Sequence, residues 1–449
     1  MKIALVFLIA LAMPLVGKPF RAGLAAVDIS PDGPIYQNGY GNRTKPSTGV
    51  KQKIWVKAVA IEDPSGKQVV IVTSDLLGLP GSVSDVVCAR VGKQYGLVRS
   101  QIILNSSHTH GAPIVDGNLH TMLDLTDAER KVIHVYTERL KDQLVEVIGR
   151  ALADLKPAQL AIGHGSAGFA INRRVKAKNG DFAIGKNPLG PIDHDVPVLR
   201  ILSPDGKLRA ALFGYTCHNT TLGGDIYEVH GDYAGYAQES FERDHPGAMG
   251  LFYIQCGGDQ NPDPRGKFED AEKYGKQLAD AVSEVIAGKM IDVKGPVRTA
   301  FRLTELSFKL HTREQFEAEL KDKLGAKVRR AQFQLSLYDQ GRPMRSVPYP
   351  VQAIRFGKQW TLVALGGEVV IDYQIRVKKE FAGEDTTVAG YSNDVMCYIP
   401  SLRVLKEGGY EADSSMIYYG KPGQWTEGVE EQIMATVTKV MADVGRKKK

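Results

Sequence analysis

Residues 102–110 read Ile-Ile-Leu-Asn-Ser-Ser-His-Thr-His, an apolar run that changes directly into polar side chains able to carry chemistry. The apolar half is typical of a buried strand, and the polar half is typical of the loop that leaves it. Four more apolar runs pass into polar residues in the same way, at 210–215, 251–254, 362–365 and 388–390. Ligands of α/β sheets bind beyond the carboxyl ends of the strands. We therefore predict that these strand ends share one edge and form the functional site.

Helical patterns alternate with the strand patterns along the chain. Thr126 and Glu129 form a capping box ahead of apolar residues that recur at helical spacing as far as residue 155, and Thr312 with Gln315 repeats this signal. Residues 271–285 and 429–444 also show helical periodicity. The sequence thus predicts an α/β fold (mixed α+β), with a mixed β-sheet core flanked by helices. No repeat or long linker divides the chain, so we expect one domain over 18–445 and a basic tail over 446–449.

The first 17 residues differ from the rest of the chain. Lys2 precedes a run of about thirteen apolar residues, which is shorter than the roughly 20 needed to span a bilayer. We interpret residues 1–17 as a cleaved signal peptide, with an uncleaved anchor as the alternative. A secreted or periplasmic protein follows from this interpretation. The 4 cysteines are too few for a disulfide framework in a chain of 449 residues, and they allow two bridges at most.

The charge balance argues against nucleic acid as a partner. Lys and Arg number 57 against 51 Asp and Glu, and part of the excess lies in the last four residues. Such a small excess is typical of a solvated surface rather than of a polyanion-binding face. We expect a small-molecule or lipid substrate, with transient contact to a membrane surface as a further possibility. The sequence leaves the oligomeric state undecided.

Several residues at the predicted strand ends are potential metal ligands. His108 and His110 form a His-x-His pair, and His218 and Glu368 follow two other strands. Zinc takes three or four N, O or S ligands, and neutral imidazole is a common one. Each residue also has a structural interpretation: an exposed or structural histidine pair, a core histidine, and a carboxylate at a helix start. Together they favour a site for one metal ion, because no structural role accounts for all of them.

A set of short motifs along most of the chain identifies a family resemblance. In order they are Gly39-Tyr40-Gly41, Ser74-Asp75-Leu76, Ser-His-Thr-His-Gly-Ala-Pro at 107–113, Ile171-Asn172-Arg173, His218-Asn219-Thr220, Gly-Asp-Tyr-Ala-Gly-Tyr at 231–236, 257–262, Gly367-Glu368, Ser392-Asn393, Tyr398-Ile399, Tyr410-Glu411-Ala412 and Tyr419-Gly420. With this set the chain resembles the neutral ceramidase family, zinc-dependent amidases that cleave N-acylated sphingoid bases in sphingolipid metabolism.

The resemblance implies a set of roles for individual residues. It implies one Zn²⁺ per chain, with ligands at His108, His218, Glu368 and Tyr398. It also implies that His110, Arg173 and Tyr410 surround the scissile carbonyl. In chemical terms, a metal-activated water would attack the carbonyl, and these side chains would stabilise the oxyanion and protonate the leaving group.

Two departures from the family pattern bear on the substrate. Residues 258–262 read Gly-Asp-Gln-Asn-Pro, so that Asn261 stands where the family usually has a catalytic serine. An amide side chain orients substrate or water but cannot act as an alkoxide nucleophile. Family members also commonly carry a C-terminal immunoglobulin-like domain, which we expect to be absent here, because only about thirty residues follow Tyr419-Gly420.

These observations predict an exported, zinc-dependent amidohydrolase acting on a linear amide, either ceramide or a related acylated amine. The alternative enzyme is a metallohydrolase of the same fold that acts on an ester, lactone or carbohydrate derivative, as the change at Asn261 suggests. The non-enzymatic alternative is a catalytically silent, exported binding protein that keeps the fold.

Overall fold

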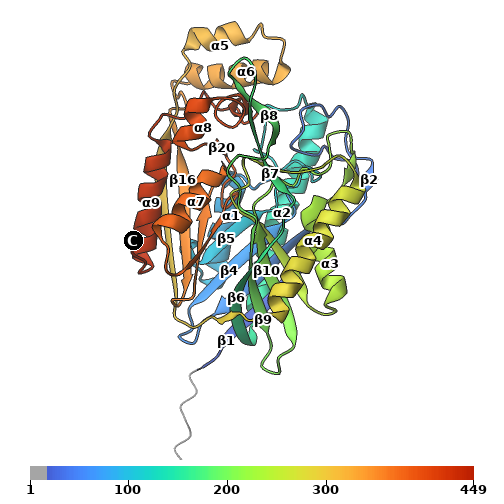
Figure 1. The fold of residues 1–449 in the computed structure, drawn as a ribbon. Coiled ribbons are helices and arrows are strands. Elements are labelled where there is room, and N and C mark those ends of the chain that lie inside the picture. The colour runs from blue at the N-terminus through green and yellow to red at the C-terminus, as the bar shows by residue number, and fades with distance from the viewer. Residues whose placement is uncertain (1–17) are drawn as a thin grey trace, which may run out of the picture.

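The computed structural model describes residues 18–449 (Figure 1). The expected signal peptide over 1–17 lies outside the described residues. The largest sheet has nine strands in the order β12-β10-β9-β6-β1-β3-β4-β5, with β14 beside β6. Its strands are β1 (Phe20–Asp28), β3 (Trp55–Glu62), β4 (Gln68–Ser74), β5 (Ile102–Ser106), β6 (Lys156–Ser166), β9 (Asp195–Leu202), β10 (Leu208–Tyr215), β12 (Met249–Ile254) and β14 (Ile291–Asp292).

Four smaller sheets complete the β structure. A four-stranded sheet has the order β15-β16-β17-β19, a three-stranded sheet the order β13-β7-β8, and two short pairs join β11 to β2 and β18 to β20. These strands are β2 (Gly49–Val50), β7 (Ala170–Lys176), β8 (Phe182–Asn187), β11 (Glu228–Val229), β13 (Gln260–Pro262), β15 (Val297–Ser307), β16 (Ser346–Phe356), β17 (Trp360–Leu365), β18 (Glu368–Val369), β19 (Asp385–Ala389) and β20 (Tyr398–Ile399).

Six of the nine helices in the described residues cover the outer faces of the two main sheets. The nine helices are α1 (Gly81–Tyr95), α2 (Asp127–Ala153), α3 (Asp232–Asp244), α4 (Phe268–Ala287), α5 (Arg313–Glu319), α6 (Gly325–Asp339), α7 (Ile371–Glu380), α8 (Leu402–Glu407) and α9 (Val429–Asp443), with short 3₁₀ turns at Arg99–Gln101 and Ser414–Ile417. The predicted capping boxes form at Thr126 and Thr312, where α2 and α5 begin. None of the helices in the described part of the chain has the length and hydropathy needed to cross a membrane.

The alternation of side chains along the strands explains the layered arrangement. In β3, Val56, Ala58 and Ala60 pack towards α1 and α2, whereas Val59 and Ile61 pack against the four-stranded sheet. Both faces are buried, which is why residues 54–61 read as a nearly continuous apolar run. The result is four layers, in which helices α1 to α4, the nine-stranded sheet, the four-stranded sheet, and α7 with α9 follow one another (Figure 1). This is the mixed α/β fold with flanking helices that the sequence predicts.

Two sequence expectations concern side chains outside the sheets. The 4 cysteines are all free and buried, so the described structure contains no disulfide bridge. Arg446, the first residue of the expected basic tail, is buried, and its guanidinium donates to Thr361, Thr386 and the Phe381 carbonyl. This arginine therefore anchors the end of the chain to the four-stranded sheet instead of adding to a solvated charge.

Candidate metal centre and active site

The Asn105 side chain joins the carboxyl ends of three strands. Its Nδ2 donates to the carbonyls of Gly390, at 2.8 Å, and Ile254, at 3.4 Å, and its Oδ1 accepts from the Ile254 amide at 3.0 Å. Asn105 lies in β5, Ile254 ends β12, and Gly390 directly follows β19 of the other main sheet. The strand ends identified in the sequence therefore meet at one point, as predicted, and the polar loops leave from there.

His108 and His110 lie on the loop that follows β5. His108 has φ of 63°, in the left-handed region that non-glycine residues seldom occupy. Its Nδ1 donates to the Leu77 carbonyl at 2.7 Å, so Nε2 is the ring nitrogen that faces the site. The Nε2 of His110 lies 3.2 Å from the Nε2 of His108. Both imidazoles thus face the same small volume.

His218, Glu368 and Tyr398 approach this volume from other elements. The Nδ1 of His218 donates to the Gly257 carbonyl at 2.6 Å, so its Nε2 also faces the site. That Nε2 lies 3.1 Å from Oε2 of Glu368 and 3.0 Å from the Tyr398 hydroxyl. Glu368 is paired with Tyr398 in the two-residue β18–β20 ladder, which places both side chains at the same level. The Nε2 of His108 is 2.9 Å from the same Glu368 oxygen.

This donor set fits a metal cation. The Nε2 atoms of His108 and His218 lie 2.9 Å and 3.1 Å from the same Glu368 oxygen, and imidazole nitrogen and carboxylate oxygen are both common zinc ligands. Burial, and then the charge of Arg173, lower the pKa of His218 to about 3, so its ring is neutral at pH 7. The ring nitrogens of His108, His110 and His218 lie within 4.8 Å of one another, a spacing that can hold a metal ion.

Arg173 connects the metal-facing residues with the loop that carries Asn261. One terminal nitrogen donates to the Tyr398 hydroxyl at 2.9 Å, and the other donates to Oδ1 of Asn261 at 3.3 Å. Strand β7, which carries Arg173, pairs with β13, which carries Asn261. The centre of the Tyr410 ring lies 5.4 Å from that of the Tyr398 ring and 5.8 Å from the Arg173 guanidinium carbon. The structure thus brings together all eight residues named as site candidates, while their individual roles remain a prediction.

Three supporting residues were not identified as functional from the sequence. The Glu411 carboxylate accepts from Nε of Arg173 at 2.8 Å and from Arg174 at 2.5 Å. Tyr419 donates to the Glu368 oxygen that faces away from the histidines, Oε1. Gly39, at φ of 88°, approaches His110 so closely that a Cβ would lie 2.3 Å from its Nδ1. All three lie in quoted motifs, and Glu411 directly follows Tyr410, which was assigned a role; membership of a motif was the available signal.

Comparison with known proteins agrees with this geometry. Residues 20–251 match the family model described as neutral/alkaline non-lysosomal ceramidase, N-terminal. The chain belongs to the neutral ceramidase family. A neutral ceramidase of Pseudomonas aeruginosa is 25% identical over 333 residues, which cover 69% of this chain and 48% of that protein. The alignment with this relative thus spans about half of the relative's length.

Other relatives and solved structures of this family extend over more of the chain. A neutral ceramidase of Mycobacterium tuberculosis is 21% identical over 490 residues, covering 90% of this chain and 74% of that protein. The crystal structure of the Pseudomonas aeruginosa neutral ceramidase superposes with a TM-score of 0.72 at 19% identity. A structure described as ceramidase complexed with C2 gives 0.75 at 18% identity. Each superposition covers 95% of this chain and 75% of the other, so the mixed α/β fold is that of the neutral ceramidases.

Proposed function

We propose that this protein is a zinc-dependent hydrolase that cleaves an N-acyl amide, with ceramide or a related acylated amine as substrate. The observation that carries the proposal is the convergence of Nε2 of His108 and Nε2 of His218 on the Glu368 carboxylate in a buried site. Family membership supports the reaction class. The aligned part of the Pseudomonas relative is about half of that protein, so its activity is carried over as part of this proposal.

In the proposed site, His108, His218, Glu368 and Tyr398 hold the zinc ion. Bound there, zinc would lower the pKa of water towards about 7 and polarise the carbonyl oxygen. Arg173 donates to the Tyr398 hydroxyl and so carries a fixed positive charge beside the place where an oxyanion would develop. His110 faces the same volume through Nε2 and is placed to pass a proton to the leaving amine.

Asn261 supports water rather than a side chain as the nucleophile. Its Oδ1 accepts from Arg173 and from the Thr220 hydroxyl, each at 3.3 Å. A carboxamide held in this way has no proton to lose and forms no acyl-enzyme. We therefore propose that Asn261 orients substrate or water.

Metal analysis of three variants tests the metal part of the proposal. Purified protein should contain about one zinc per chain. His108→Ala and His218→Ala should lose most of the metal and nearly all turnover, whereas His110→Ala should keep the metal and lose rate. Full metal retention in both of the first two variants would refute the ligand assignment.

A substrate panel tests the bond that is cleaved. Hydrolysis of N-acylsphingosine supports the proposal, whereas turnover of only an ester, lactone or glycoside would favour the alternative metallohydrolase that Asn261 motivates. A metal-loaded protein that retains a ligand but turns over none of these compounds would be a silent binding protein.

We also propose that the protein is exported and that its signal peptide is removed near residue 17. The apolar run after Lys2 supports this, as does its shortness relative to a bilayer. Sequencing of the mature amino terminus is the test, and an intact Met1 in a membrane fraction would support an anchor instead.

A further inference from the structure

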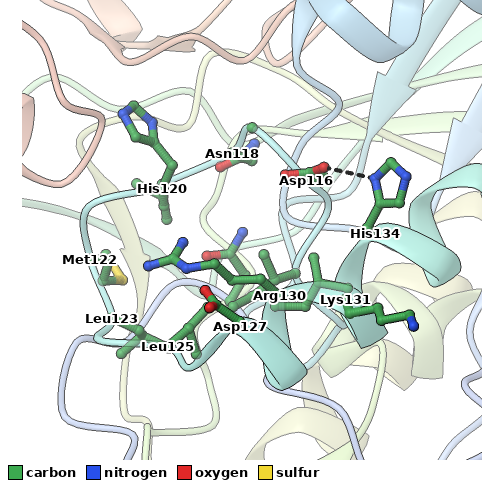
Figure 2. Close-up of a pocket in the computed structure, with 15 residues that line it drawn as sticks. Asp116, Asn118, His120, Met122, Leu123, Leu125, Asp127, Arg130, Lys131 and His134 are labelled. Atoms are coloured by element: carbon green, nitrogen blue, oxygen red, sulfur yellow. Dashed lines mark hydrogen bonds and ion pairs between the residues drawn. The ribbon is translucent and has the colours of Figure 1, made fainter. Parts of the chain in front are cut away.

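A cavity of about 400 Å³ lies beside the candidate active site, between the loop that follows His110 and the first turns of α2 (Figure 2). It falls within the range of about 300–1,000 Å³ that is usual for small-molecule sites. Asn38 lines the cavity, and the next residue, Gly39, packs directly against the His110 ring. The cavity and the metal-facing histidines therefore share a wall.

The walls of the cavity are apolar but include one unsatisfied polar atom. Leu119, Met122 and Leu123 are each 7% exposed and line one side of it. Oδ1 of Asn118 is buried and has no hydrogen-bond partner among the described residues, whereas Nε2 of His120 packs against Gly420. Asn118 is only 2% exposed, so its unpaired acceptor is enclosed by the protein. A buried polar atom without a partner is uncommon, and at a cavity wall it indicates a missing ligand group or water.

The cavity lining carries two bases, Arg130 and Lys131, and two acids, Asp116 and Asp127. Arg130 and Lys131 form no ion pair with any residue in the range 18–449, and Figure 2 shows Arg130 reaching into the cavity from α2 with Lys131 at its outer edge. Of the two acids in the lining, Asp116 lies 3.2 Å from His134, and Asp127 lies in the first turn of α2. A carboxylate in that turn is already stabilised by the helix dipole.

His120 adds no charge to the cavity. Burial, followed by the charges of Lys421 and Arg130, lowers the pKa of this histidine to about 4. His120 is therefore neutral at pH 7, and the positive charges of the lining are those of Arg130 and Lys131. An anion that enters the cavity would meet an unpaired guanidinium, which binds carboxylates well.

We propose that this cavity binds a single-chain amphiphile that ends in a carboxylate. The apolar chain would lie against Leu119, Met122 and Leu123, and the carboxylate would pair with Arg130, with Lys131 adding attraction at the rim. The inference deepens the proposed function and rests on it for the source of the ligand. The carboxylate belongs either to the amine part of a substrate, as in an N-acyl amino acid, or to a free fatty acid.

Titration calorimetry of the full-length protein tests the site, with dodecanoate as the probe. Dodecyltrimethylammonium and dodecyl maltoside, used below their micellar concentrations, keep the chain and change the head group. Dodecanoate should bind at least tenfold more tightly than either of these two compounds. The substitution Arg130→Glu should raise the dissociation constant of dodecanoate at least tenfold. Lys439→Glu on α9 makes a comparable charge change at an exposed lysine far along the chain and should leave binding unchanged. Equal affinity for the three head groups, or no effect of Arg130→Glu in a variant with unchanged thermal unfolding, would overturn the proposal.

The metal-site variant His218→Ala separates this inference from the proposed function. Dodecanoate binding should persist in this variant, because the cavity does not include the metal-facing residues. Loss of binding would place the ligand at the metal site and overturn the inference. Persistence of binding in an enzyme that hydrolyses no amide would leave the cavity intact and refute only the proposed function.

Two substrates identify the source of the carboxylate. With Arg130→Gln, a KM at least tenfold higher for N-dodecanoylglycine, together with an unchanged KM for N-dodecanoylglycinamide, assigns the cavity to the substrate. Unchanged KM values for both, together with weaker dodecanoate binding, assign it to a free fatty acid. Each of these outcomes supports a carboxylate site, whereas a rise in KM for the neutral amide alone would contradict it.

Discussion

The substitution Glu411→Gln should destabilise the protein strongly, because it leaves the buried Arg173 guanidinium without a counter-charge and Arg174 with Glu407 alone. Glu411 is 2% exposed and accepts from Arg173 and Arg174, whose side chains are 5% and 2% exposed. Removing one partner of a buried ion pair costs about 3–5 kcal/mol, since the remaining charge stays desolvated. For about 430 residues, unfolding entropy near 2.1 cal/mol/K per residue converts this loss into a Tm lower by about 3–5 °C.

Glu407→Gln is the matched control for this experiment. Glu407 accepts from the same Arg174, at 3.1 Å, but is 22% exposed, so its loss should cost less than about 1 kcal/mol. Scanning calorimetry and urea unfolding of both variants give the comparison. Equal, small losses in the two variants would show that the arginines find other partners or water, and the argument from buried charge would be wrong.

Three further predictions concern other parts of the molecule. Burial alone would lower the pKa of His164, but hydrogen bonds to Asp195 and Asp385 raise this pKa to about 10. The stability that protonated His164 contributes is therefore complete below about pH 6.5 and lost as the pH rises towards 10. Urea unfolding should show that the free energy of unfolding of the wild type falls between these pH values, and that this fall is absent in His164→Gln. The difference should be about 1 kcal/mol or less, because His164 is 36% exposed. Tyr419→Phe removes a hydrogen bond to Glu368 and should weaken zinc binding by about 10–100-fold in a chelator competition, while an unchanged affinity would deny it a supporting role. Asn261→Ser should stay active within about tenfold, with no acyl adduct detected by mass spectrometry during a single turnover.

Much of the fold was predictable because buried strands leave a direct trace in the sequence. The apolar runs at 251–254 and 362–365 lie in β12 and β17, and their polar continuations lie at the site. Capping boxes are equally local signals, and the two identified in the sequence, at Thr126 and Thr312, both form. Helix α1 was missed because it begins after Pro80 with no capping side chain and no acidic residue in its first turn. Local rules therefore found those elements whose signals are local.

The site was predictable in composition but not in geometry. His108 and Glu368 are 260 residues apart, and no local sequence pattern predicts that Nε2 of the first lies 2.9 Å from Oε2 of the second. The ladder that sets Glu368 beside Tyr398 is two residues long in each strand, too short for any periodic pattern. Glu411 also escaped notice, because a carboxylate next to a tyrosine has many ordinary interpretations and its two arginine partners come from β7.

The wide spacing of the proposed zinc ligands has a consequence for how the protein is made. His108 leaves the ribosome well before Tyr398, and at about 5–20 residues per second the interval is roughly 15–60 s. During that time the growing chain holds an imidazole pair without the carboxylate and phenol that complete the coordination shell. With the proposed ligands, the complete coordination shell exists only in a chain synthesised nearly to its end, so zinc content would measure how many molecules have finished folding.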